Sequence, residues 1–209
     1  SKRLGYGGDS HLMMITHSYR KFKKYKDAHP EYFALVDGKR AFGSECVANG
    51  EGHLCLTNPD VINQWAEDIC QYFKENPEID IFPLGPEDGL NRTCECENCL
   101  KELRMDLPRQ EQYSYHIWNF TQKVAKKVAE RYPNKYVGAL AYEHYRAPSR
   151  ELGEMKNVAV SFSNWRSRCV NPQEREKIHA ELEEWSSRCD RLYLWNWYLD
   201  HWMPMTNLP

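Results

Sequence analysis

The chain has 209 residues, of which 28 are basic and 30 acidic, so its formal net charge is −2. This balance argues against nucleic acid or an anionic membrane surface as the partner, because both select a strongly basic face. No apolar run approaches the roughly 20 residues of a membrane-spanning helix, and the length suits one domain with a core of its own.

In chain order, short apolar segments alternate with segments of helical periodicity. One helix begins at Asn58-Pro59, where Asn58 can cap the first turn and Pro59 suits the first helical position, and it ends before Pro77. A second helix ends at Tyr132-Pro133, and Asn171-Pro172 predicts the start of a third. The predicted strands are residues 12–17, 79–84, 136–142, 158–162 and 192–197.

The alternation predicts an α/β fold. Strands separated by helices of this length are typical of parallel sheets with right-handed crossovers. We predict a (β/α)8 TIM-type barrel, of which residues 1–209 form a single, partial domain with about five βα units. An open doubly wound sheet is the alternative, although no glycine-rich phosphate loop follows a strand. We expect the segment to be inactive alone, or to need the remaining parts of a larger parent chain.

A long loop at residues 85–112 separates two of the predicted elements, and loops of that length are usually functional or mobile. It carries Cys94, Cys96 and Cys99, three of the eight cysteines. These thiols could bind zinc with a fourth ligand from elsewhere, such as His116 or another cysteine, or they could form a disulfide. In both cases we interpret the cluster as a structural clip for the loop, and no further cofactor is required.

The ends of the predicted strands are rich in acids, histidine, amides and large aromatic residues, and barrels carry their catalytic groups at such positions. Aromatic faces stack on sugar rings, and paired carboxylic acids cleave glycosidic bonds. We therefore predict a glycoside hydrolase with Asp88 as general acid, Glu87 as its partner and Glu143 in reserve. The predicted substrate-binding residues are His17, Tyr142, Asn164, Trp165, Trp195, Trp197, Tyr198 and Asp200.

Other interpretations of these residues remain open. Solvent exposure alone explains acids and amides at strand ends, and an acidic surface turn is the simpler explanation of Glu87-Asp88. Arg146 and Arg166 could bind a substrate carboxylate, as on a uronic acid, or pair with local acids. A non-catalytic glycan-binding barrel would keep the aromatic residues, and a structural or interaction domain could be organised by a metal at the cysteines.

Several segments together resemble a bacterial family, the domain of unknown function 4838. They are residues 29–35, 37–40 and 54–59, Asp88-Gly89 with the three-cysteine motif after it, and the ending from Trp195 to Pro209. The resemblance runs over nearly the whole chain. It implies a glycoside-hydrolase-like barrel, a secreted or periplasmic parent protein that degrades polysaccharides, and an oligo- or polysaccharide as partner.

A more distant resemblance is to the family 20 hexosaminidases, whose barrels place an Asp-Glu pair after the fourth strand. Glu87-Asp88 would lie at that position, and the strands here would be the third to the seventh. Tyr198-Leu199-Asp200 resembles a sugar-binding stretch after the seventh strand. Because the two acids stand in the reverse order, the role of each and a substrate-assisted mechanism stay open.

Overall fold

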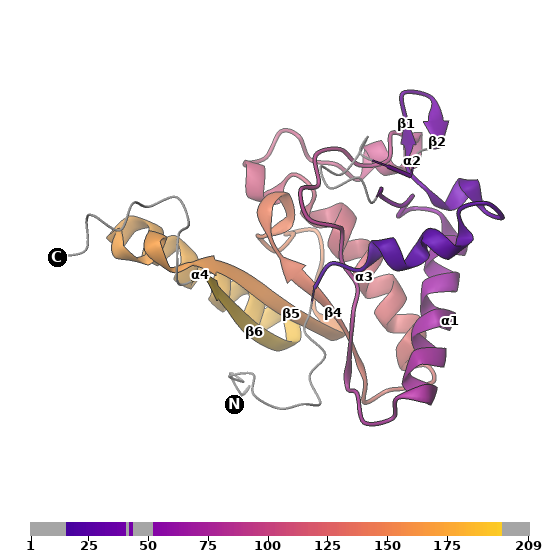
Figure 1. The fold of residues 1–209 in the computed structure, drawn as a ribbon. Coiled ribbons are helices and arrows are strands. Elements are labelled where there is room, and N and C mark those ends of the chain that lie inside the picture. The colour runs from indigo at the N-terminus through magenta and orange to yellow at the C-terminus, as the bar shows by residue number, and fades with distance from the viewer. Residues whose placement is uncertain (1–15, 41, 44–51, 198–209) are drawn as a thin grey trace, which may run out of the picture.

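The protein is an α/β fold built on one parallel sheet, seen in a computed structural model that describes residues 16–40, 42–43 and 52–197 (Figure 1). Strands β3 (Ile81–Pro83), β4 (Tyr136–Ala141), β5 (Met155–Trp165) and β6 (Cys189–Trp197) lie side by side in sequence order and pair in parallel. The α/β character and the parallel pairing agree with the prediction. The described residues form no closed barrel, so the TIM-type barrel stays a prediction. Most of the predicted strand 12–17 lies outside the described residues.

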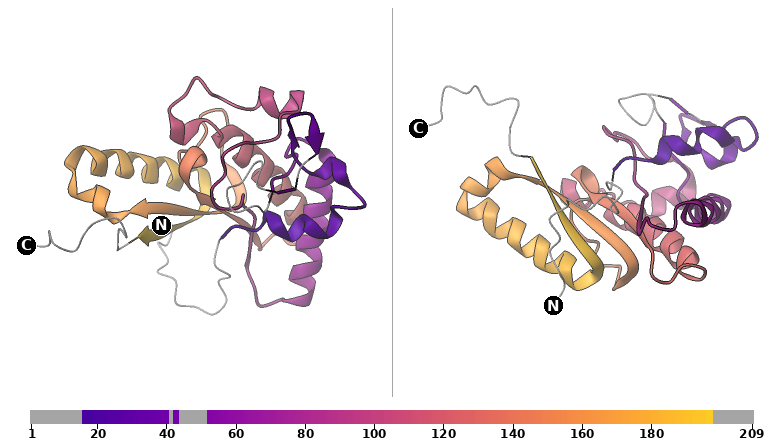
Figure 2. Two further views of the ribbon diagram at one scale, coloured as in Figure 1. Left: turned by 45° about the horizontal axis from the view of Figure 1, so that its top comes forward. Right: turned by 60° about the horizontal axis from the view of Figure 1, so that its bottom comes forward.

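Three long helices cover the sheet, and two begin where the sequence predicts. The Asn58 side chain accepts a hydrogen bond from the Asp60 amide at the start of α1 (Pro59–Glu75), and Asn171 caps α4 (Pro172–Arg188) in the same way. Helix α3 (Ser114–Ala129) packs on β4 and β5, α1 packs on α3, and α4 runs along β5 and β6 (Figure 2). The strand ends are therefore held from one side by α3 and α4.

The connection from β4 to β5 differs from the predicted alternation, because it contains no α-helix. It consists of the 3-10 helix η4 (Glu143–Tyr145) and a loop that includes Pro148 and Gly153, residues that disfavour a helix interior. Buried indoles fix its path. Trp118 of α3 donates to the Tyr145 carbonyl at 3.0 Å, and Trp185 of α4 donates to the Arg146 carbonyl at 2.8 Å.

A bulge near the start of β5 sets its register against β6. The register shifts between Met155 and Ala159, and Asn157 adopts a positive φ of 59° there, a conformation that asparagine tolerates. The backbone amide of Asn157 donates to the Asp190 carboxylate at 2.6 Å, and its side-chain amide donates to the Pro133 carbonyl at 2.7 Å. Beyond the bulge the strands run in step, so their C-terminal ends lie next to each other.

Smaller elements surround this sheet. Strands β1 (Leu35–Val36) and β2 (Lys39–Arg40) form a hairpin whose turn, Asp37-Gly38, has positive φ at both positions, as tight hairpin turns require. The predicted long loop 85–112 contains α2 (Glu97–Lys101) and η3 (Arg109–Glu111). The other 3-10 helices are η1 (Tyr19–Tyr25), η2 (Pro30–Tyr32) and η5 (Arg166–Val170).

The core lies between the sheet and the helices and is rich in aromatic side chains. Trp65, Trp118 and Trp185 are almost completely buried. The rings of Trp65 and Phe22 stack with their centroids 4.7 Å apart, which fastens η1 to α1. None of the helices in the described part of the chain is long and apolar enough to cross a membrane.

Candidate functional site

The end of β3 lies against a segment from far earlier in the chain. The backbone amides of Ser18 and Tyr19 both donate to the Gly85 carbonyl, at 3.0 and 3.2 Å. The Gly85 amide in turn donates to the Ser18 hydroxyl at 3.1 Å. These reciprocal bonds place residue 17 next to the loop that leaves β3.

His17, Asp88 and Tyr142 meet at this place. The Nε2 atom of His17 lies 3.9 Å from an Asp88 carboxylate oxygen, and its Nδ1 atom is hydrogen-bonded to the Pro86 carbonyl. The rings of His17 and Tyr142 meet edge to face, with centroids 6.2 Å apart. Asp88 accepts a hydrogen bond from the Gly89 amide, and 63% of its side chain is exposed. A substrate could therefore reach this carboxylate.

Tyr142 lies close to two carboxylates. The pKa of Tyr142 is raised to about 12, chiefly by burial and then by the negative charges of Asp88 and Glu143. Glu143 begins η4, one residue beyond Tyr142, with a positive φ of 45°, and its carboxylate pairs with Arg109 at 3.0 Å. A non-glycine residue with positive φ is uncommon, and such residues cluster at functional sites. The predicted reserve carboxylate is thus a neighbour of the same tyrosine as Asp88.

Glu87 lies in different surroundings from Asp88. Its side chain is fully buried, and it accepts hydrogen bonds from the Arg20 amide at 2.9 Å and from the Arg20 guanidinium at 2.6 Å. The carboxylate thereby joins the loop after β3 to η1. This geometry favours Glu87 as a residue that positions Asp88, whereas the sequence predicted it as an acid/base partner.

The predicted amide and aromatic residues fall into separate groups. Asn164 is buried at the end of β5 and donates to the Asn196 side chain at 3.0 Å. Trp165 lines a pocket of about 280 Å³ together with Tyr142 and Glu143. Trp195 instead packs against a small apolar cluster on the sheet. The Trp197 side chain, Tyr198 and Asp200 lie outside the described residues.

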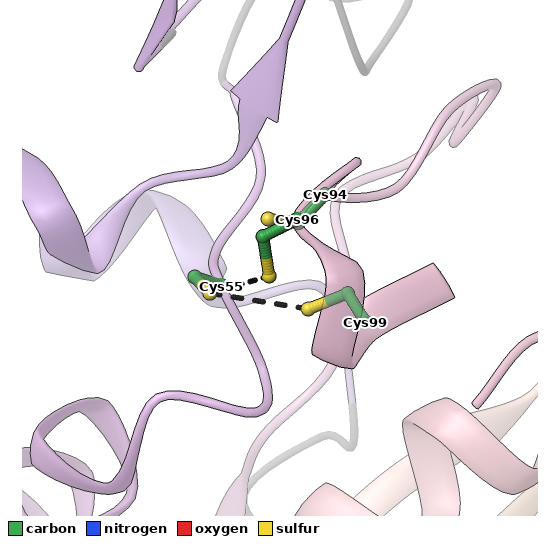
Figure 3. A group of neighbouring side chains, drawn as sticks. All are labelled: Cys55, Cys94, Cys96 and Cys99. Atoms are coloured by element: carbon green, nitrogen blue, oxygen red, sulfur yellow. Dashed lines mark hydrogen bonds between the residues drawn. The ribbon is translucent and has the colours of Figure 1, made fainter. Parts of the chain in front are cut away.

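A second cluster is made of four cysteines. The sulfur atoms of Cys55, Cys94, Cys96 and Cys99 all lie within 4.8 Å of one another, and three of the four residues are buried (Figure 3). Cys55 comes from the segment before α1, whereas the others come from the loop after β3 and from α2. These four residues could bind a metal ion. We call them the four-cysteine cluster.

The spacing of the sulfur atoms suits a tetrahedral metal ion. A metal–sulfur bond of about 2.3 Å gives tetrahedral edges of about 3.8 Å between sulfur atoms. The Cys55 sulfur lies 3.7 Å from that of Cys96 and 3.9 Å from that of Cys99. All four cysteines are free thiols in the structure, so the predicted disulfide alternative is not formed among them. His116, the other predicted ligand, pairs with Glu102 at 2.7 Å.

Hydrogen-bond donors surround the sulfur atoms. The Leu35 amide donates to the Cys94 sulfur at 3.3 Å, and the Arg40 guanidinium lies 3.7 Å from the same atom. The Thr57 hydroxyl lies 3.1 Å from the Cys99 sulfur. Such donors stabilise negative charge on thiolates and orient them, as the outer partners of metal ligands do.

Without a cation the four thiols cannot all ionise. Hydrogen bonds from the Cys94 and Cys99 thiols lower the pKa of Cys55. The neighbouring Cys55 sulfur raises the pKa of Cys94 to about 11 and also raises that of Cys99. Like charges in a buried site repel each other, so one thiolate keeps its neighbours protonated. A divalent cation among them would remove this penalty, because coordinated thiols lose their protons.

Cys55 is the member of the cluster that the three-cysteine motif does not reveal. It is flanked by the buried residues Leu54 and Leu56, so locally it has the pattern of a core cysteine. No spacing rule connects it to Cys96, which is 41 residues further along the chain. The bridge that pairs Leu54 with Phe33 places its segment beside β1, whose Leu35 amide donates to the Cys94 sulfur.

Comparisons with known proteins place the chain in one family. No curated protein and no solved structure matches it significantly. The family model described as Domain of unknown function (DUF4838) matches residues 3–209, which is nearly the whole chain and includes the strand ends and all four cysteines of the cluster. The chain therefore belongs to the family of the Domain of unknown function (DUF4838).

Proposed function

We propose that the protein is a carbohydrate-active enzyme that cleaves glycosidic bonds at the C-terminal ends of its parallel strands. The observation that carries this proposal is the meeting of Asp88, His17 and Tyr142, three residues far apart in sequence. Parallel α/β sheets bind their ligands beyond the carboxyl ends of the strands, where this group lies.

In this proposal Asp88 is the general acid. It is exposed, and it lies beside the imidazole ring of His17 and the phenol of Tyr142. A sugar seated against Asp88 would bring its glycosidic oxygen within reach of the carboxyl group, as proton donation to that oxygen requires. Glu143 is the second carboxylate, since both acids are neighbours of Tyr142. Trp165 offers a face for stacking on the sugar.

Hydrolysis of chromogenic glycosides tests the activity. The full-length protein is incubated with N-acetylhexosaminides, uronides and neutral hexosides of both anomeric types, and released chromophore is measured. We expect release from at least one class. No release from any of these glycosides, together with sugar binding by calorimetry, would instead indicate a glycan-binding domain without activity.

We also propose that the four-cysteine cluster binds a structural zinc ion. Four sulfur ligands in a tetrahedron suit zinc or iron, and a site with four protein ligands has no open position for a substrate. The ion would join the segment before α1 to the loop after β3 and to α2. It would leave the proposed acid/base chemistry to the carboxylates.

Metal analysis of protein purified without chelators tests this assignment. We expect about one zinc per chain, as four ligands around one ion imply. Exchange for cobalt(II) should produce the intense charge-transfer and visible bands of a tetrahedral tetrathiolate. Protein without metal, or with iron in place of zinc, would contradict the assignment, and so would a mass that shows the four cysteines oxidised in pairs.

A further inference from the structure

A pocket opens beside Tyr142, and the proposed second carboxylate, Glu143, lies in its wall. Its volume is about 280 Å³, and it lies at the C-terminal ends of β4 and β5, where η3, η5 and α4 complete its wall. Trp165, the last residue of β5, lines it. Because Tyr142 belongs both to this pocket and to the surroundings of Asp88, the two places adjoin.

The pocket has an excess of positive charge, although the chain as a whole is negative. Three of its basic side chains are paired with acids. Arg109 pairs with Glu143 at 3.0 Å, Arg146 with Glu181 at 2.7 Å, and Lys177 with Glu174 at 2.9 Å. The fourth, Arg168, forms no ion pair among the described residues, although its charge contributes, after the hydrogen bond from Lys177, to lowering the pKa of Glu174. An anion in the pocket would therefore meet one cation that need not break an ion pair to bind it.

The pairs themselves differ in strength. Arg146 and Glu181 are only 12% and 15% exposed, so they form a fixed wall. Arg109 and Lys177 are 69% and 67% exposed. Exposed ion pairs contribute little to stability, because water and salt screen them. Both side chains can therefore turn toward a ligand at small cost, and Arg168, which is also exposed, can approach the same ligand.

We infer that this pocket binds an anionic group carried by a sugar, the carboxylate of a uronic acid or a sulfate ester, and so selects acidic glycans. The inference rests on the proposed function, since it assigns the substrate class of the same strand-end surface. A guanidinium presents a planar fork of donors that matches carboxylate and sulfate oxygens. Trp165 would stack on the ring that carries the anionic group, one subsite away from the bond beside Asp88.

Binding measurements test the pocket independently of turnover. The full-length protein is titrated with a trigalacturonate, a sulfated trisaccharide and neutral cellotriose by calorimetry. We expect an acidic trisaccharide to bind at least about tenfold more tightly than cellotriose, and the preference to shrink at high salt. Which of the two acidic trisaccharides binds more tightly shows whether the pocket selects a carboxylate or a sulfate.

Two variants locate the effect. Arg168→Ala should weaken binding of the acidic trisaccharide about tenfold and leave cellotriose unchanged. The matched control is Lys156→Ala, which removes an exposed cation from the opposite end of β5 and should change neither. Equal affinity for acidic and neutral sugars, or equal effects of both variants, would overturn the inference. Turnover of neutral glycosides alone would overturn the acidic-glycan inference and leave the glycosidase proposal intact. Binding of acidic glycans without any turnover would overturn the glycosidase proposal and leave the inference intact.

Discussion

Replacing Cys55 by serine is expected to remove the bound metal and to destabilise the protein by about 3 kcal/mol or more. Among the described residues, Cys55 is the member of the four-cysteine cluster that comes from outside the loop after β3 and α2. Its loss would therefore disconnect that loop from the segment before α1. A site with three thiolates keeps an open position and binds zinc less tightly. Because metal binding contributes to the free energy of folding, weaker binding also lowers the stability of the protein.

The control is Cys70→Ser, because Cys70 and Cys55 are each only 4% exposed and Cys70 lies on α1 outside the cluster. Both variants place a hydroxyl in a buried site, but only Cys55→Ser removes a metal ligand. Urea unfolding of each is compared with and without a chelator. The chelator should destabilise the wild type and Cys70→Ser, and should change Cys55→Ser little. Equal stability of the two variants, with equal responses to the chelator, would show that the cluster holds no stabilising ion.

Local physics explains which parts of the fold were predictable. The starts of α1 and α4 depend on Asn58-Pro59 and Asn171-Pro172, whose caps need only the next few residues, and both were predicted correctly. The apolar segments at 81–83 and 136–141 were likewise predicted as strands. Signals of this kind are contained within one turn or one strand.

Long-range partners explain what the sequence could not indicate. Glu87 and Asp88 are adjacent and chemically alike, yet Glu87 is buried because Arg20, 67 residues earlier, meets it at the end of β3. Cys55 joins the cluster because its segment pairs with the chain just before β1. The charged pocket likewise gathers Arg109 from η3 and Lys177 from α4. None of these neighbours lies within one element, so no periodicity predicts them.

Replacing Asp88 by asparagine is expected to lower kcat on a responsive substrate by a factor on the order of 10² to 10⁴, the range that general acid catalysis contributes. The stability should be unchanged, since 63% of the Asp88 side chain is exposed and its hydrogen bond from the Gly89 amide can be kept by the asparagine oxygen. Kinetics and thermal unfolding of the same preparation measure both quantities.

The control Glu87→Gln should show the opposite pattern. The Arg20 guanidinium would lose a charged acceptor at a buried position, which we expect to cost about 2 kcal/mol of stability, below the cost for a fully buried pair because Arg20 is half exposed. Its effect on kcat should be smaller than that of Asp88→Asn and should fall equally on all substrates.

The leaving group separates a general acid from a residue that only shapes the site. The dinitrophenolate of a dinitrophenyl glycoside leaves without protonation, whereas the alcohol of an alkyl glycoside leaves only when the glycosidic oxygen receives a proton. Asp88→Asn should therefore slow the alkyl glycoside far more than the dinitrophenyl glycoside, while Glu87→Gln slows both alike. If Asp88→Asn slows the two substrates equally, Asp88 is not the acid. Glu143, the other carboxylate beside Tyr142, then becomes the residue to replace, and Glu143→Gln should give the leaving-group dependence that Asp88→Asn lacked.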